Sequence, residues 1–243
     1  MRLFIVPTPI GNLKDITLRG IEVLKQVDYI FCEDTRRTKI LLDHYEIKDK
    51  KLISYFAPFE AKKIPQLLEI LKRNEAALVV DSGMPVISDP GYKLIKACLE
   101  NSIEIEVLPG PTAFLTALIG SGLPLDKFLF LGFLPKKGLE NYFRKIKDLE
   151  VTIAFYESPK RISKTLEVIR KVFGNCQVVI AREVSKIYEE YLRGDIEEII
   201  EKLKDKKLKG EITVIIRRTT HNERRTNKNS FIASYQLQSF SAS

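Results

Sequence analysis

Five short apolar runs alternate with segments of helical periodicity along the first half of the chain. The apolar runs lie at residues 2–6, 29–32, 51–55, 76–80 and 103–107. The segments that follow them have apolar residues at helical spacing, which predicts helices at 18–28, 35–44, 61–73, 92–100 and 112–118. Parallel strands require long crossovers, usually helices, and are buried on both faces. The alternation therefore predicts an α/β fold with a mostly parallel sheet covered on both sides.

The segment "GSGLPLD" at residues 120–126 interrupts this alternation, and its two Gly and one Pro predict a linker between domains. Further strands are predicted at 128–133, 151–155, 177–182, 191–194 and 211–217. Helices are predicted near 139–148, 160–172 and 195–204. The third and fourth of these strands are close enough in sequence to be antiparallel, which predicts a mixed sheet.

These patterns predict two α/β domains followed by a tail. The N-terminal domain is expected to span residues 1–118, and the C-terminal domain residues 119–218. After Arg218 the chain becomes polar and basic, and we expect residues 219–243 to be disordered.

The net charge of +8 is unevenly distributed. Residues 1–118 contain 16 Lys/Arg and 16 Asp/Glu, whereas residues 119–216 contain 19 and 15, and residues 217–243 contain 5 and 1. A polyanionic partner would therefore meet the second half of the chain. Simple solvation of the surface is an equally valid interpretation of this excess.

The cysteines and apolar runs indicate the compartment. Cys32, Cys98 and Cys176 are far apart and form no CxxC or Cys/His cluster, which favours a reducing compartment and argues against a zinc site. The apolar run at the N-terminus is too short for a signal peptide, and no stretch approaches the ~18 apolar residues of a membrane span. We expect a cytoplasmic protein that holds no metal and no membrane segment.

Four loops follow strands of the predicted parallel sheet and are rich in Gly, Pro, Asp and Thr. They lie at residues 7–17, 33–38, 81–91 and 109–114. Each could simply cap a helix: Asp89 before Pro90 suits an N-cap and first helical position, and Asp15 or Thr17 could cap the first helix. A cap needs only one residue, however, and ligands of open parallel sheets bind beyond the carboxyl ends of the strands.

Together these loops predict a cradle for a small organic cofactor. Gly11, Gly83 and Gly110 would let a ligand approach the backbone closely. Apolar side chains that could wall a flat base or a thioether are Ile10, Met84, Val86 and Ile87. No GxxxxGK[ST] or GxGxxG motif is present, which argues against a P-loop enzyme or a dehydrogenase. The residues by themselves indicate a nucleoside-like ligand and leave the chemistry open.

Seven motifs in order carry a resemblance to a known family: "TPIGNLKDIT", "EDTR", "DSGMPVISDPG", "PGPTA", "FYESPKR", "AREVSKIYEEYLRG" and "KGEITVII". Together they resemble the tetrapyrrole methylase superfamily of S-adenosylmethionine-dependent methyltransferases. Within it they are similar to the bacterial 16S ribosomal RNA (cytidine-2'-O)-methyltransferases. The resemblance covers residues 3–217, about nine-tenths of the chain.

The resemblance implies two α/β domains with S-adenosyl-L-methionine in the cleft between them. It also implies a homodimer that methylates the ribose 2'-hydroxyl of one cytidine in the decoding centre. The substrate would be 16S rRNA within the assembled small ribosomal subunit, and no metal would take part.

The resemblance also implies which residues bind the cofactor. They are Ile10, Gly11, Asp81, Gly83, Met84, Pro85, Ile87, Thr112, Ala113, Tyr156, Ala181, Gly210 and Thr213. Two departures from the family pattern stand out. Met84 replaces a common Thr, and "ISYFAPFEAKK" at residues 53–63 replaces a His/Asn-rich segment that is a substrate edge in the family.

Methyl transfer mainly requires the methyl carbon to lie in line with the attacking oxygen, because the sulfonium is already a good leaving group. A nearby base would help the ribose hydroxyl lose its proton, and Asp34, Asp89 and Glu157 are the candidates. Cationic candidates for stabilising charge are Arg36, Lys160, Arg161, Arg182 and Lys186. From these we select Glu157, Lys160, Arg161 and Asp89 as catalytic residues, although the "ESPKR" turn could also be a solvated helix start.

Basic side chains are the expected RNA contacts, since Lys and Arg neutralise phosphates without reading sequence. They are Arg36, Lys136, Lys137, Arg144 and Arg182. Two alternatives remain. The chain could be a sibling methylase acting on a tetrapyrrole or a protein residue, or a non-catalytic RNA-binding assembly factor with an inactive cofactor cleft.

Overall fold

The computed structural model describes residues 1–56 and 60–218. Within them the chain forms two compact units, which are described separately. The first contains residues 1–120 together with 182–190, and the second contains the remaining described residues. The expected boundary after residue 118 stays a prediction, and the expected disordered tail lies outside the described residues.

The first unit contains a five-stranded sheet in which every neighbouring pair is parallel. The strand order is β3-β2-β4-β1-β5. The strands are β1 (Arg2–Ile5), β2 (Tyr29–Cys32), β3 (Lys51–Ser54), β4 (Ala76–Val79) and β5 (Glu104–Val107). All five lie where the apolar runs predicted them, and the prediction of a parallel sheet is confirmed.

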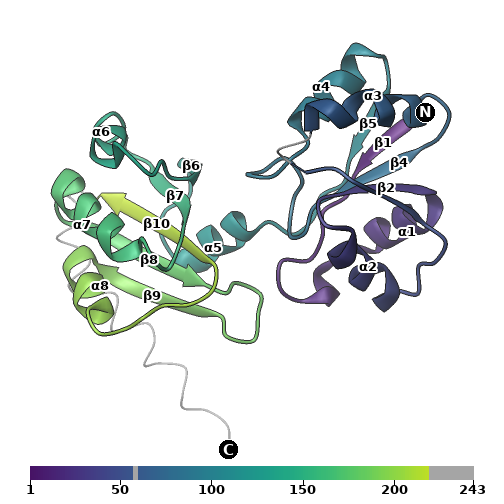
Figure 1. Cartoon of the computed structure of the whole chain (residues 1–243). Coiled ribbons are helices and arrows are strands. Elements are labelled where there is room, and N and C mark those ends of the chain that lie inside the picture. The colour runs from purple at the N-terminus through teal and green to yellow at the C-terminus, as the bar shows by residue number, and fades with distance from the viewer. Residues whose placement is uncertain (57–59, 219–243) are drawn as a thin grey trace, which may run out of the picture. The chain divides into compact units, whose positions relative to one another are not determined.

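Both faces of this sheet are covered by helices, as Figure 1 shows. On one face Phe4 and Val79 pack with α1 (Leu18–Gln26) and α2 (Thr35–His44). On the other, Leu3 and Leu78 pack with α3 (Glu60–Leu71) and α4 (Tyr92–Glu100). Successive strand residues point to opposite faces, so an apolar run without alternation supplies two cores at once.

Local capping defines where the first helices begin. Thr17, one of the two expected caps, accepts the Gly20 N–H at 3.0 Å in front of α1, after the short 3-10 turn η1 (Leu13–Asp15). Asp34 caps α2 by accepting the Arg36 N–H at 2.9 Å. These side chains satisfy amides that have no partner inside the helix.

The second unit contains a mixed five-stranded sheet of order β6-β7-β10-β8-β9. β6 (Phe128–Phe133) pairs in parallel with β7 (Thr152–Glu157), whereas β10 (Ile212–Arg218) pairs with β7 antiparallel. The remaining strands are β8 (Cys176–Arg182) and β9 (Glu190–Asp195). The predicted mixed sheet is confirmed.

Helices cover one face of the second sheet and form a single core with it. These are α6 (Leu139–Arg144), α7 (Ile162–Phe173) and α8 (Ile196–Leu203). Phe143, Leu166 and Ile199 are completely buried among the strand residues Phe155 and Val214. The side-chain period of a strand leaves the neighbours of these residues, such as Tyr156 and Thr213, on the opposite face.

Two element boundaries differ from the sequence prediction. α5 (Ala113–Ser121) runs into the expected linker, because its apolar sequence continues the helix through Ile119. α6 is shorter than the predicted 139–148. From Lys145 onward the predicted helix is replaced by non-helical turns.

Two further expectations concern chemistry and membranes. The three cysteines are buried free thiols. No helix in the described part of the chain is long and apolar enough to cross a bilayer.

Candidate functional site

The loops after β1 and β4 are joined at the carboxyl edge of the first sheet. Thr8 and Gly83 exchange two backbone hydrogen bonds of 3.0 Å each, and the Thr8 hydroxyl donates to the carbonyl of Val80 at 2.9 Å. Gly83 has φ +86°, and a Cβ there would lie 3.3 Å from Ile10 Cγ2 and 3.7 Å from the Pro111 carbonyl. Three of the four predicted loops therefore converge at this glycine.

The loop 81–91 adopts a strained path. Besides Gly83 and Gly91, two residues with side chains have positive φ, Val86 at 76° and Ser88 at 68°. Such conformations are costly for residues with a Cβ and persist only where the surroundings hold them. A loop of this kind fits a ligand-binding role better than a simple connection.

The prediction that Asp89 and Pro90 cap the next helix is wrong. α4 begins at Tyr92. Its N-cap is Gly91, which has no side chain to accept a hydrogen bond from the helix. The Gly91 N–H instead donates to Glu60 Oε1 at 2.8 Å. The helix begins two residues later than expected, so Asp89 lies before the capping position.

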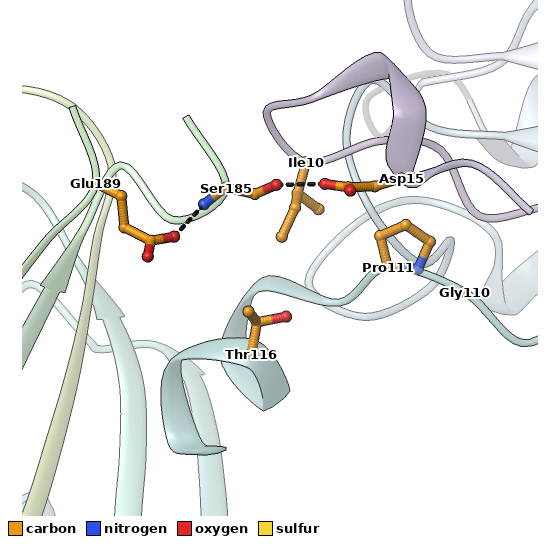
Figure 2. A pocket seen from close by; sticks show the side chains of 7 residues that line it. All are labelled: Ile10, Asp15, Gly110, Pro111, Thr116, Ser185 and Glu189. Carbon is orange, nitrogen blue, oxygen red and sulfur yellow. Dashed lines mark hydrogen bonds between the residues drawn. The ribbon is translucent and has the colours of Figure 1, made fainter. Parts of the chain in front are cut away.

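A pocket of about 430 Å³ lies within the first unit, next to these loops. Figure 2 shows the residues that line it, which are Ile10, Asp15, Gly110, Pro111, Thr116, Ser185 and Glu189. The volume is in the range of small-molecule sites. The lining combines apolar Ile10 and Pro111 with polar and acidic side chains, which suits an amphiphilic ligand.

Ser185 links the two acidic groups of the pocket. Its hydroxyl donates to Asp15 Oδ2, and its backbone N–H donates to Glu189 Oε2 at 2.6 Å (Figure 2). The segment that carries Ser185 packs tightly against the first loop, because a Cβ on Gly11 would lie 2.5 Å from Lys186 Cγ. Only glycine at this position permits the contact.

Carboxylates crowd the same sheet edge. Arg36 donates two hydrogen bonds to Asp34, which lowers the pKa of Asp34 to about 2. Asp81 accepts the Asp34 N–H at 3.1 Å and pairs with Arg37 at 3.4 Å. Burial, together with repulsion from Glu33 and Asp81, raises the pKa of Asp89 to about 6.

Replacing Asp89 by Asn should remove a pH-dependent loss of stability. Between the ordinary pKa of about 4 and the native value of about 6, the folded carboxyl keeps a proton that the unfolded chain releases. The free energy of unfolding of the wild type therefore falls as the pH rises through this window. At pH 7 we expect Asp89→Asn to raise Tm by roughly 2–4 °C, the effect of about 1 kcal/mol in a chain of this size.

Circular dichroism melting curves at pH 4, 5, 6 and 7 measure this effect. Asp205→Asn, at an exposed position, is the matched control and should follow the wild type at every pH. An Asp89→Asn curve parallel to that of the wild type would contradict the prediction.

The expected cofactor residues of the first unit all lie on these converging loops or at the start of α5. Pro85 is buried, Ile87 is 37% exposed, and the Thr112 hydroxyl donates to the Gly110 carbonyl at 3.3 Å. The residues placed there are Ile10, Gly11, Asp81, Gly83, Met84, Pro85, Ile87, Thr112 and Ala113. Their contact with a cofactor remains a proposal.

The expected cofactor residues of the second unit gather on one face of its sheet. Tyr156 on β7 is the register partner of Thr213 on β10, and Ala181 lies on the neighbouring strand β8. The Tyr156 ring packs against two phenylalanines of β6, with ring centroids 5.2 Å apart in each case. Gly210, with φ +86°, precedes β10. This face is the one opposite the helices.

The "ESPKR" turn joins β7 to α7, as predicted, but its charged residues are mostly engaged. Glu157 has a side chain only 2% exposed and accepts the Thr165 hydroxyl at 2.6 Å and the Ser158 N–H at 2.8 Å. Arg161 donates to the carbonyls of Leu134 and Pro135 and lies 3.5 Å from Glu157. These contacts favour a structural role for both residues, whereas Lys160 is exposed.

The expected RNA contacts differ in how free their charges are. Lys136 and Lys137 are exposed just before α6. Arg144 pairs with Glu140 at 2.7 Å, Arg182 with Glu190 at 3.0 Å, and Arg36 with Asp34. The two lysines are therefore the cations best placed to meet phosphates.

Sequence reasoning missed most of the pocket lining. Asp15 was considered only as a cap, and Ser185 and Glu189 lie in a motif assigned to the second domain. Residues 57–59 of the expected substrate edge lie outside the described residues. In the parts of the chain that the structure describes, no group of three or more His, Cys, Asp or Glu side chains could hold a metal ion.

The profile of a known family, described as "Tetrapyrrole (Corrin/Porphyrin) Methylases", matches residues 2–200. The chain belongs to this family. The resemblance inferred from the seven motifs is thereby confirmed, and the fold agrees with it. The structure is similar to that of a tetrapyrrole methylase, the native form of uroporphyrin III C-methyl transferase from Thermus thermophilus, with a TM-score of 0.61 and 17% identity. That similarity covers 88% of this chain and 97% of the other.

Two relatives have much higher sequence identity, and both are named ribosomal RNA small subunit methyltransferase I. The Hydrogenobaculum protein is 51% identical over 219 residues, which cover 89% of this chain and 95% of the relative. The Thermotoga maritima protein is 45% identical over 217 residues, which cover 88% and 97%.

The residues at the sheet edge fit the cofactor expected of such a methylase. Gly83 leaves open a space that a side chain would fill, between Ile10 and the Pro111 carbonyl. The adjoining pocket combines the apolar side chains of Ile10 and Pro111 with the carboxylates of Asp15 and Glu189, which can receive cationic groups such as a sulfonium or an ammonium.

Proposed function

We propose that the chain is an S-adenosyl-L-methionine-dependent methyltransferase that modifies the ribose 2'-hydroxyl of a cytidine in 16S rRNA. The observation that carries this proposal is the similarity to two ribosomal RNA small subunit methyltransferases I over almost their whole length, at 51% and 45% identity. Its substrate is the small ribosomal subunit, and the protein therefore acts in the cytoplasm.

The cofactor supplies a methyl group on a sulfonium, and the protein must align that group with the attacking ribose oxygen. The loops held together by Thr8 and Gly83 bind the cofactor, with Ile10, Met84 and Ile87 as apolar walls. The resemblance also assigns cofactor contacts to Tyr156, Ala181, Gly210 and Thr213. The double hydrogen bond between Thr8 and Gly83 supports this assignment, because it makes the cradle rigid before any ligand arrives.

Asp89 is the strongest of the three candidates for the base that takes the hydroxyl proton. A base is most effective when its pKa lies near the operating pH, and the pKa of Asp89 is raised to about 6. Asp34 is a weaker candidate because Arg36 holds its pKa at about 2. Glu157 is a weaker candidate because both of its oxygens already accept hydrogen bonds. Lys160 is the exposed cation of the "ESPKR" turn and is assigned to the RNA phosphate.

Transfer of labelled methyl groups tests the function directly. Purified protein and methyl-labelled S-adenosyl-L-methionine are incubated with small subunits from cells lacking this enzyme, and the RNA is digested to nucleosides. We expect label in 2'-O-methylcytidine. Label on a base would overturn the 2'-hydroxyl assignment. No label, with cofactor binding confirmed by calorimetry, would direct attention to tetrapyrrole or protein substrates, and absent cofactor binding would support the non-catalytic alternative.

We also propose that the protein is a homodimer that uses the edge strand β6. The sequence of β6, "FLFLGF", has no charge, and Phe128 and Phe133 are 44% and 69% exposed. An uncharged apolar edge strand is normally covered by a partner. Light scattering should give twice the chain mass of 27.9 kDa for the wild type and the monomer mass for Phe133→Arg. A dimeric Phe133→Arg protein would exclude this strand as the interface.

A further inference from the structure

Glu60 is a buried carboxylate in the first unit, outside the pocket and outside the expected cofactor residues. It is the first residue of α3 and is 9% exposed. Its Oε1 accepts the Tyr55 hydroxyl at 3.0 Å and the Gly91 N–H at 2.8 Å, and its Oε2 lies 3.7 Å from Lys93 Nζ. Buried carboxylates are costly unless they are hydrogen-bonded in this way. The cost of burying Glu60 is therefore offset by these specific contacts.

The hydrogen bond to Gly91 ends the loop 81–91. Gly91 has φ +140°, and a Cβ there would lie 2.8 Å from Val86 Cγ2, so the turn is tight and the position has no side chain of its own to cap α4. Glu60 accepts the N–H of this N-cap residue from 31 residues away. A carboxylate is also favoured there by the positive end of the helix dipole.

The opposite end of the loop is anchored by the two backbone hydrogen bonds between Thr8 and Gly83. Between the two anchors lie Val86 and Ser88, which have left-handed backbones. A strained loop relaxes when one anchor is lost. The Thr8 anchor restrains only the first half of the loop. The second half, which includes Ile87 and Asp89, is restrained by the bond between Glu60 and Gly91.

Tyr55 fixes the carboxylate in turn. It is 1% exposed, and burial followed by the hydrogen bond with Glu60 raises its pKa, so the phenol keeps its proton and donates. The result is a chain of contacts from the end of β3 through Glu60 to the turn before α4.

We propose that Glu60 is a positioning residue for the methyl-transfer reaction, which holds the cofactor loop 81–91 in its binding conformation through the Gly91 amide. The proposal rests on the proposed function, because it assigns this loop to S-adenosyl-L-methionine. Glu60 is buried, and we assign its effect to the Gly91 amide of the loop.

Calorimetry with S-adenosyl-L-methionine on Glu60→Ala and Glu60→Gln tests the proposal. Loss of a buried hydrogen bond to a charged group should weaken cofactor binding about tenfold in Glu60→Ala. In Glu60→Gln one amide oxygen can accept from both Tyr55 and Gly91, so the Kd should stay within about twofold of the wild type. Kinetics should show a matching rise in the KM for the cofactor in Glu60→Ala, while the KM for the small subunit changes by less than about twofold.

A matched control separates positioning from general stability. Leu71→Ala truncates a fully buried residue of the same helix and should lower Tm by creating a cavity. Because Leu71 has no bond to the loop, its Kd for the cofactor should remain that of the wild type. If Glu60→Ala does not fold, Glu60→Asp takes its place, since its shorter side chain cannot reach both donors.

Unchanged cofactor affinity in a folded Glu60→Ala or Glu60→Asp protein would overturn the positioning role, as would equal weakening in Leu71→Ala. A wild-type protein that binds no S-adenosyl-L-methionine would instead overturn the proposed function.

Discussion

Replacing Gly83 by Val should abolish binding of S-adenosyl-L-methionine while the protein remains folded. The backbone at this position has φ +86°, and a Cβ would already lie 3.3 Å from Ile10 Cγ2. The two methyl groups of Val would then extend into the space between Ile10 and the Pro111 carbonyl. We expect the Kd measured by calorimetry to rise by about 100-fold or more, which corresponds to roughly 2.7 kcal/mol.

The fold should survive this substitution. A residue with a Cβ in an unfavourable backbone conformation costs roughly 1–3 kcal/mol, against a typical stability of about 5–15 kcal/mol. Gly138→Val is the matched control, since Gly138 has φ +70° and a Cβ there would meet no atom within 4 Å. It should lower Tm and leave cofactor affinity unchanged. Normal affinity in a folded Gly83→Val protein would refute the assignment of this loop to the cofactor.

Removing the two lysines before α6 should weaken binding to the small subunit without affecting the cofactor. Lys136 and Lys137 are exposed, in contrast to the paired Arg144 and Arg182. Each phosphate contact contributes a slope of up to about 0.9 to the dependence of log affinity on log salt. For Lys136→Ala with Lys137→Ala we expect a slope smaller by up to about 2 and an affinity about tenfold lower at moderate salt.

Filter binding of labelled small subunits over a range of salt concentrations measures both quantities. Lys164→Ala with Lys207→Ala removes the same charge from two other exposed positions of the second unit. This control should leave the slope unchanged. Equal effects in the two double variants would mean that the subunit responds to net charge and not to this site.

Much of the fold could be predicted because its signals are local. The strands β1 to β5 coincide with short apolar runs, and such runs identify strands buried on both faces whatever surrounds them. Thr17 was a predictable cap because its partner amide is three residues away. The motifs also identified the family, since their order and spacing are read directly from the chain.

The candidate site could be located but not assembled from the sequence. The composition of 81–91 marked it as a functional loop, yet Asp89 is not the cap, because the helix begins only after Gly91. Ser185 was assigned to the second domain, whereas its hydroxyl bonds to Asp15 in the first unit. Neither the position of the helix start nor the contact between Ser185 and Asp15 can be predicted from the neighbouring residues.

Short-range patterns specify the strands, the parallel pairing of the first sheet and the glycine-rich loops at its edge, because periodicity and turn chemistry act over a few residues. Which groups meet at those loops depends on long-range contacts. Glu60 accepts the Gly91 N–H from 31 residues away, and Ser185 donates to Asp15 across 170 residues. Hydrogen bonds of this kind depend on how whole elements pack, and packing joins residues that no local pattern connects.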